Sequence, residues 1–106
     1  MKQKLLLICL LISTIVLAKD AERKILRGKV INRNVNVVGV NVVNNTASKG
    51  TATNSKGEYE ILAKEGDILV FSSVQYTIRE VTITNGILQN NRLVVEVKEK
   101  VEELDE

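Results

Sequence analysis

Few side chains in this sequence could do chemistry. The chain contains no histidine, so a zinc site lacks its commonest nitrogen ligand and a nucleophile lacks an imidazole to activate it. The serines that could be considered as nucleophiles are Ser48, Ser55, Ser72 and Ser73. Without a base beside them, nucleophilic catalysis is not expected. The sequence therefore predicts no catalytic residue and a protein that is not an enzyme.

Three carboxylates, Glu58, Glu65 and Asp67, could be combined into a calcium site. A calcium loop, however, takes several oxygen ligands at close and regular spacing. The segment from Glu65 to Asp67, with Gly66 at its centre, is more simply interpreted as a turn. We therefore expect no metal site and no cofactor.

The first 18 residues have the three parts of a secretory signal. Lys2 and Lys4 precede an almost unbroken apolar stretch from Leu5 to Leu17, and cleavage is expected after Ala18. As a helix this stretch would cover about 20 Å, against about 30 Å for the hydrocarbon core of a bilayer. Its length argues against the alternative, an uncleaved membrane anchor. The sequence predicts a signal peptide over residues 1–18 and an exported protein.

Cleavage also changes the charge and the redox chemistry. Cys9, the one cysteine, lies inside the apolar stretch without a small residue before it, so lipidation there is not expected and the mature domain must fold without a disulfide.

The loss of Lys2 and Lys4 leaves equal numbers of basic and acidic residues, 13 of each. Basic residues gather in 19–56 and acidic ones in 57–106, halves that interleave in a sandwich. We expect no binding to nucleic acid, because basic clusters with exposed aromatic residues are absent.

The elements of the mature chain are short strands. Val and Ile dominate, aromatic residues make up 3% of the chain, and apolar residues alternate with polar ones. Val38, Val40 and Val42, for example, fall on one side of a predicted half-buried strand. No segment shows a convincing helical period. The strands are predicted at 25–31, 35–45, 51–53, 58–64, 68–73, 77–83 and 93–98, with turns at 32–34, 54–57, 64–67 and 84–86.

Seven short strands with a turn signal every eight to twelve residues predict an all-β fold, a small seven-stranded β-sandwich. The sandwich is expected to occupy residues 25–98. Residues 19–24 are predicted to be a flexible leader and residues 99–106 an acidic linker or tail.

The order of several short motifs resembles the carboxypeptidase-regulatory-like domain. The resemblance implies a transthyretin-like (prealbumin-like) Greek-key sandwich that is an accessory domain rather than the peptidase itself. Two segments depart from the family pattern: residues 34–38 replace a turn that usually carries glycine, and Val74-Gln75-Tyr76 replaces aromatic-glycine-tyrosine. The motifs are Leu26-Arg27-Gly28-Lys29-Val30, Val38-Gly39-Val40-Asn41-Val42, Lys49 to Asn54, Gly57-Glu58-Tyr59, Gly66 to Ser72, and Gln75-Tyr76 ahead of Val81.

Each motif also has a structural interpretation. Gly39 is expected to let the chain swing into the second strand, and residues 51–57 to form a hairpin with Gly57 at positive φ. Gly66 and Asp67 are expected to reverse the chain into a central strand at 68–73. Phe71 and Tyr76 are predicted to bury the largest areas.

The resemblance implies two classes of function. In Gram-negative bacteria such a domain commonly precedes the plug and barrel of a TonB-dependent outer-membrane receptor, and residues 101–106 are similar to the linker that joins it to the plug. The partner would then be the plug or a periplasmic protein, and the location the periplasm or the periplasmic face of the outer membrane. The alternative is a free-standing periplasmic module that binds a protein or a glycan through its loops. An exposed strand edge or the acidic tail could make the contact. The sequence downstream of Glu106 would discriminate between the two.

Overall fold

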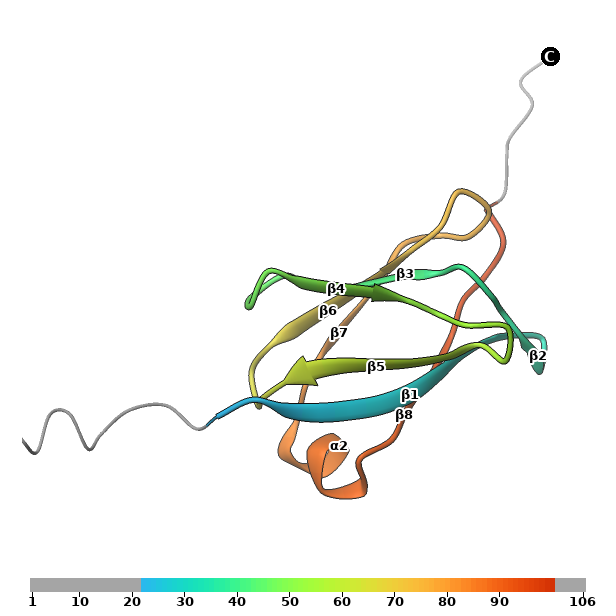
Figure 1. Ribbon diagram of the computed structural model, residues 1–106. Coiled ribbons are helices and arrows are strands. Elements are labelled where there is room, and N and C mark those ends of the chain that lie inside the picture. The colour runs from blue at the N-terminus through green and yellow to red at the C-terminus, as the bar shows by residue number, and fades with distance from the viewer. Residues whose placement is uncertain (1–21, 101–106) are drawn as a thin grey trace, which may run out of the picture.

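A computed structural model describes residues 22–100 as two four-stranded sheets that face each other (Figure 1). This confirms the predicted all-β sandwich, which has eight strands within these residues where seven were predicted. The first sheet contains β1 (Lys24–Asn32), β2 (Val35–Asn36), β5 (Glu58–Ala63) and β8 (Leu93–Glu96). The second contains β3 (Asn41–Asn44), β4 (Lys49–Ala52), β6 (Ile68–Ser72) and β7 (Arg79–Thr82), in the order β4-β3-β6-β7.

Strand β1 organises the first sheet. It pairs in antiparallel fashion with β5, where Gly28 lies opposite Tyr59, and with β2, where Ile31 lies opposite Asn36. On its other side it pairs in parallel with β8, where Gly28 lies opposite Leu93. In the second sheet all pairs are antiparallel, and β6 lies inside the sheet between β3 and β7. The predicted central position of 68–73 is confirmed.

The core lies between the two sheets and is built mainly by every second residue of their strands, as the alternation predicts. Phe71 is fully buried, in agreement with prediction, but the second large aromatic residue is Tyr59, whose ring meets that of Phe71 edge to face with centroids 5.5 Å apart. The prediction for Tyr76 was wrong, because this side chain is only partly buried against the core. The buried apolar residues are Leu26, Val30, Val37, Val40, Val42, Tyr59, Ile61, Ala63, Leu69, Phe71, Ile83, Val95 and Val97.

The strand predicted at 35–45 is two strands in different sheets. The amide of Val37 still donates to the carbonyl of Val30 on β1 (3.0 Å), whereas the amide of Val40 donates to the Thr53 hydroxyl (2.9 Å). Between them Gly39, at φ 79°, makes the swing that was predicted for it. Val38 is consequently exposed and does not share a buried face with Val40 and Val42.

The hairpin predicted at 51–57 was wrong, because β4 and β5 belong to different sheets and the segment crosses between them. Thr53 holds the crossing in place: its buried hydroxyl donates to the carbonyl of Val37 (2.7 Å) and accepts from Val40. Gly57 has the predicted positive φ, 74°, and a Cβ there would lie 2.8 Å from the carbonyl oxygen of Val30. The connection from β5 to β6 through Gly66 and Asp67 likewise passes from one sheet to the other.

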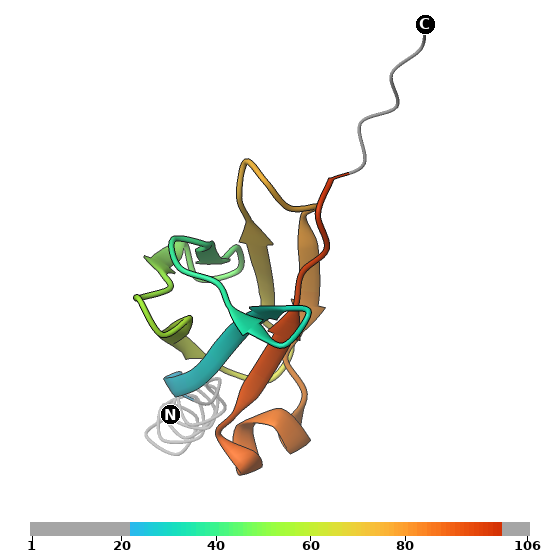
Figure 2. The same cartoon turned by 90° about the vertical axis from the view of Figure 1, so that its right-hand side faces the viewer.

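The turn predicted at 84–86 begins a short helix, α2 (Asn85–Asn90), although no helix was expected. Thr84 is its N-cap and accepts a hydrogen bond from the amide of Ile87 (3.2 Å), and Asn91 ends the helix in the left-handed conformation. Ile87 and Leu88 pack against the core. Six residues are too few for the 3.6-residue period to be visible in the sequence. In Figures 1 and 2 the helix lies beside the start of β8.

The ends of the domain extend beyond the predicted limits. Lys24 already belongs to β1 and Arg23 forms an ion pair, so these two residues are not part of a flexible leader. At the other end the amide of Lys100 donates to the carbonyl of Gln75 (3.1 Å) and Glu99 pairs with Tyr76. The signal peptide over 1–18, residues 19–21 of the leader and residues 101–106 of the acidic tail lie outside the described residues. Within residues 22–100 no helix has the length and apolar character needed to cross a bilayer.

Candidate functional site

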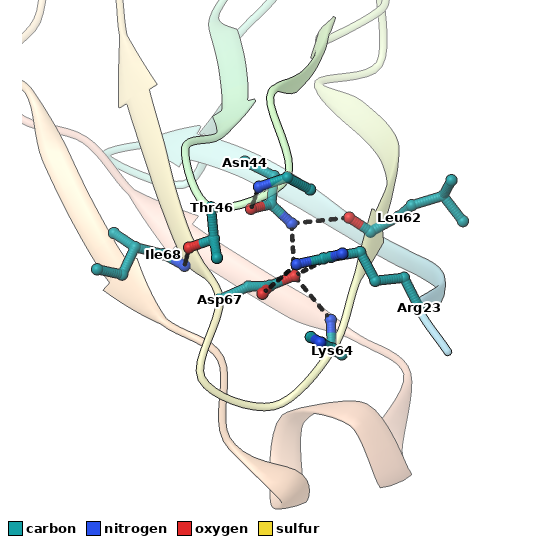
Figure 3. Close-up of polar contacts among 8 residues, drawn as sticks. Arg23, Asn44, Thr46, Leu62, Lys64, Asp67 and Ile68 are labelled. Atoms are coloured by element: carbon teal, nitrogen blue, oxygen red, sulfur yellow. Dashed lines mark hydrogen bonds and ion pairs between the residues drawn. The ribbon is translucent and has the colours of Figure 1, made fainter. Parts of the chain in front are cut away.

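Asp67 is the centre of a buried polar cluster at the end of the sandwich where β1 begins (Figure 3). Its side chain is 1% exposed. Arg23 donates to both carboxylate oxygens, from Nε to Oδ2 (2.7 Å) and from Nη2 to Oδ1 (3.0 Å). The Asn44 amide group (2.8 Å) and the backbone N–H of Lys64 (3.0 Å) also donate to Oδ2. The carboxylate therefore has four hydrogen bonds from three parts of the chain.

Asn44 ties this cluster to both sheets. Its Nδ2 donates to the carbonyl of Leu62 on β5 (2.9 Å) as well as to Asp67, and its Oδ1 accepts from the amide of Ala47 (3.1 Å). The residue is fully buried on β3, and both N–H groups of its amide and its Oδ1 have protein partners. Within residues 22–100, no buried side-chain nitrogen or oxygen lacks a partner.

The surroundings of Asp67 shift its pKa. Burial by itself would raise the pKa, but the hydrogen bonds from Arg23, Asn44 and Lys64, together with the positive charge of Arg23, outweigh it and lower the pKa from 3.8 to about 2. The carboxylate is thus held in its charged form. A group that must take up a proton for catalysis near neutral pH would have the opposite shift. The four hydrogen bonds to Asp67, all from groups of the protein itself, give its carboxylate a structural role.

Stability should accordingly fall at acid pH. Because the pKa is lower in the folded state than in the unfolded chain, Asp67 stabilises the fold fully above about pH 4, and this contribution is lost as the pH falls towards 2. Urea unfolding followed by circular dichroism between pH 2 and pH 7 measures the loss. In the Asp67→Asn variant the dependence should be distinctly weaker. An unchanged profile in that variant would assign the acid sensitivity to other carboxylates.

The three carboxylates considered for calcium do not form a site. Asp67 points inward to Arg23, Glu65 is exposed in the turn before it, and Glu58 lies on the outer side of β5. In the described part of the chain no three histidine, cysteine, aspartate or glutamate side chains gather where they could hold a metal ion. The interpretation of 65–67 as a turn agrees with the structure.

The four serines are scattered over the molecule. Ser48 and Ser55 lie in separate turns, and Ser72 is the last residue of β6. The hydroxyl of Ser73 accepts a hydrogen bond from the amide of Gln75 (3.3 Å). No described contact gives any of these serines an activating base.

A hollow on the described surface has a volume of about 900 Å³ and is lined mainly by polar and charged residues, with Gly28, Ala52 and Tyr59 among them. Its floor includes the outward-pointing side chains of β1 and β5, where Arg27 and Glu60 form an exposed ion pair (2.8 Å). The side chain of Asn54, at one rim, is already an acceptor for the amides of Lys56 and Glu58. These groups can hydrogen-bond a polar ligand. The lining residues are Arg27, Gly28, Lys29, Thr51, Ala52, Asn54, Glu58, Tyr59, Glu60, Asn90, Asn91 and Arg92.

Tyr59, one of the lining residues, connects strands β5, β1 and β8. Its hydroxyl donates to the carbonyl of Leu93 on β8 (2.9 Å), and the ring passes over Gly28 of β1. Burial raises the pKa of the Tyr59 phenol well above its ordinary value of 10. The phenol therefore serves as a hydrogen-bond donor in the core.

Replacing Tyr59 by Phe should lower the free energy of unfolding by about 1 to 2 kcal/mol, because the carbonyl of Leu93 loses its donor while the ring and its packing remain. Chemical denaturation measures the change. Tyr76→Phe is the matched control, since Tyr76 is only partly buried, and should change the free energy by less than about 0.5 kcal/mol. Equal losses in the two variants would show that the Tyr59 hydroxyl has no special role.

The sequence did not identify Arg23 and Asn44 as members of a cluster. A signal was present for Asn44. It follows Val40 and Val42 at a spacing of two residues, so its side chain is expected on the same buried face of the strand, which makes it a polar residue at a core position. Arg23 gave no such signal, because nothing in its neighbourhood indicates a carboxylate that is distant in the sequence.

Comparison with known proteins bears on the fold and on its class of function. A family model described as the CarboxypepD_reg-like domain matches residues 26–106, which is most of the chain. No curated protein matches the sequence significantly. Domains of the matching family are transthyretin-like β-sandwiches that are generally non-catalytic, in keeping with the structural role of the buried Asp67 and Tyr59. The chain therefore belongs to the CarboxypepD_reg-like domain family, as its motifs from Leu26 onward indicated.

Proposed function

We propose that this domain is an accessory module of an exported bacterial protein, and that it acts by contact with protein rather than by catalysis. More specifically, we propose that it is the N-terminal module of a TonB-dependent outer-membrane receptor, with the adjacent plug domain as its partner. The family supports the accessory role, and the sequence of residues 1–18 supports export to the periplasm.

The structural observation that carries this proposal is the way in which the chain enters and leaves the domain. Arg23 is fixed to Asp67 at one end, and residues 98–100 are fixed to residues 75–77 at the opposite end (Figure 1). Two backbone hydrogen bonds hold the exit, from Thr77 to Lys98 (2.8 Å) and from Lys100 to Gln75 (3.1 Å). Because both ends of the chain are fixed to the domain, a domain that follows it in the same protein can be held at a defined orientation.

Cell fractionation and the downstream gene sequence test the proposal. The receptor role predicts plug and barrel strands encoded after Glu106, a mature N-terminus at Lys19 by mass spectrometry, and recovery in the outer-membrane fraction. A stop codon directly after Glu106 with no barrel gene nearby would contradict the receptor role. Recovery of the uncleaved chain from the cytoplasm would contradict export.

The second candidate is a free-standing periplasmic module that binds a protein or glycan. The polar hollow of about 900 Å³ favours it, because amide and charged groups such as Asn90, Asn91 and Arg92 can bond to hydroxyl-rich ligands. This role predicts a stop codon after Glu106 and a purely soluble periplasmic protein. Binding of the protein or glycan ligand should then be lost in Arg92→Ala and retained in Lys49→Ala, since Lys49 lies outside the hollow.

A further inference from the structure

One end of the sandwich exposes apolar side chains that the core does not use. The three most exposed large apolar residues of the described chain are Val74 (89%), Val35 (66%) and Val38 (63%). Val35 and Val38 line a hollow of about 350 Å³ together with Gln75 and Tyr76, and Val74 directly precedes Gln75. We call this surface, defined by Val35, Val38, Val74 and Tyr76, the exit face, because Lys100 leaves the domain beside Gln75.

The position of the exit face in the fold explains its exposure. Val35 is the first residue of β2, Val38 lies in the segment that leaves β2 for the second sheet, and Val74 lies in the connection between β6 and β7. Strand β2 lies at the edge of its sheet, and no strand of residues 22–100 pairs with its outer side. Valine has no polar group to present to water, so such a cluster favours contact with another apolar surface.

Charges of both signs border the exit face. Arg33 lines the same hollow, and its Nη2 lies 3.6 Å from Oε1 of Glu99, the residue that pairs with Tyr76. The two side chains are 82% and 59% exposed, so their ion pair contributes little to the stability of a single chain. Both remain available to a second molecule.

We propose that the exit face joins two copies of this chain in a weak two-fold symmetric dimer. A two-fold axis brings the same patch of each copy together, so valines meet valines while Arg33 of each copy can face Glu99 of the other. A partner whose surface carried charges of one sign only would place a like charge opposite either Arg33 or Glu99. A second copy of the same patch carries both signs, so the two copies are complementary in charge.

The dimer should be weak, because the face presents only a few side chains. Interfaces of about 1,000 Å² in total lie at the lower limit for specific association. We therefore expect a dissociation constant on the order of 100 μM. This inference does not depend on the proposed receptor role, since it rests on the surface of residues 33–38 and 74–76 and on Glu99.

Sedimentation equilibrium between about 10 μM and about 1 mM tests the dimer, using protein expressed from the full sequence and purified in the form that cells produce. Val38→Asp and Val74→Asp should each raise the dissociation constant by about tenfold or more, because each places a carboxylate in the apolar contact. Ile25→Asp is the matched control, since Ile25 is also exposed (51%) but lies on β1 near the opposite end. Any contribution from residues 1–18 is the same in every variant.

Charge reversal gives a second test that exposed valines alone could not mimic. Arg33→Glu and Glu99→Arg should each weaken the dimer by about tenfold, and the double variant should restore it to within about threefold of the original. A protein that stays monomeric to about 1 mM would overturn the proposal. A dimer unaffected by Val38→Asp and Val74→Asp, or a double variant no better than the single ones, would overturn it as well.

Discussion

Replacing Asp67 by Ala should lower the free energy of unfolding by about 3 to 5 kcal/mol. The change removes the acceptor of four hydrogen bonds and leaves the Arg23 guanidinium and the buried amide group of Asn44 without the carboxylate. A single domain of this size has a total stability of about 5 to 10 kcal/mol, so the variant should be close to unfolding at room temperature. Urea denaturation at pH 7, followed by circular dichroism, measures the loss.

The exposed ion pair between Arg27 and Glu60 provides the matched control. Its bond length, 2.8 Å, is close to that of the Arg23–Asp67 pair, but both of its side chains are more than half exposed. Glu60→Ala should therefore cost less than about 1 kcal/mol. Similar losses for Asp67→Ala and Glu60→Ala would contradict the view that burial makes the Asp67 cluster important.

Arg23→Met separates the charge from the hydrogen bonds. This variant keeps an apolar side chain over the cluster and, among residues 22–100, leaves the Asp67 carboxylate with the Asn44 side chain and the Lys64 amide as donors. We expect a loss of about 2 to 3 kcal/mol and a rise in the pKa of Asp67, because the neighbouring positive charge is gone. A carboxyl resonance that titrates as before in nuclear magnetic resonance spectra would contradict this.

Gly28→Ala should destabilise the domain by about 3 kcal/mol or more. A Cβ at this position would lie 2.2 Å from the carbonyl oxygen of Leu93 and 2.3 Å from the hydroxyl of Tyr59. Neither neighbour can withdraw freely, since Leu93 is paired with β1 and Tyr59 is packed on Phe71. One methyl group must therefore separate β1 from β8 or displace the ring, and overpacking of this kind is costly. Thermal unfolding measures the effect.

Gly50→Ala is the control for a glycine within a strand. Its Cβ would meet only a methyl group of Val43 at 3.7 Å and the carbonyl oxygen of Val42 at 3.8 Å, which are ordinary contacts. We expect a change within about 0.5 kcal/mol. A Gly28→Ala variant as stable as Gly50→Ala would show that β8 shifts without difficulty, and that the close packing of Tyr59 over β1 is not required.

The alternation of apolar and polar residues predicted strands 58–64 and 93–98, and a continuous apolar run predicted strand 68–73, all close to their observed limits. Successive side chains in a strand point to opposite faces of the sheet. A strand with one buried face therefore has an apolar residue at every second position of the sequence. The burial of Phe71 was predicted from its large aromatic ring, and the positive φ of Gly57 from the turn residues that precede it. The motifs that indicated the family lie on these strands and turns.

Local patterns could not show which strands pair. Residues 51–57 have the composition of a hairpin, yet β4 joins β3 and β5 joins β1, because the pairing is set by how two sheets close over one core. The segment 35–45 reads as a single strand for the same reason: its change of sheet depends on Val30 and Thr53, which lie outside it. Helix α2 was missed because six residues cannot display a helical period.

The sequence by itself determined the all-β class, the family and the absence of histidine chemistry, since these depend on residue types and on a period of two along the chain. Only the tertiary structure decided the rest. It brought Arg23, Asn44 and Asp67 together across as many as 44 positions of sequence, and it placed Val35 and Val38 around one hollow with Gln75 and Tyr76. Contacts between distant segments arise when two sheets pack, and no local pattern encodes which residues will meet.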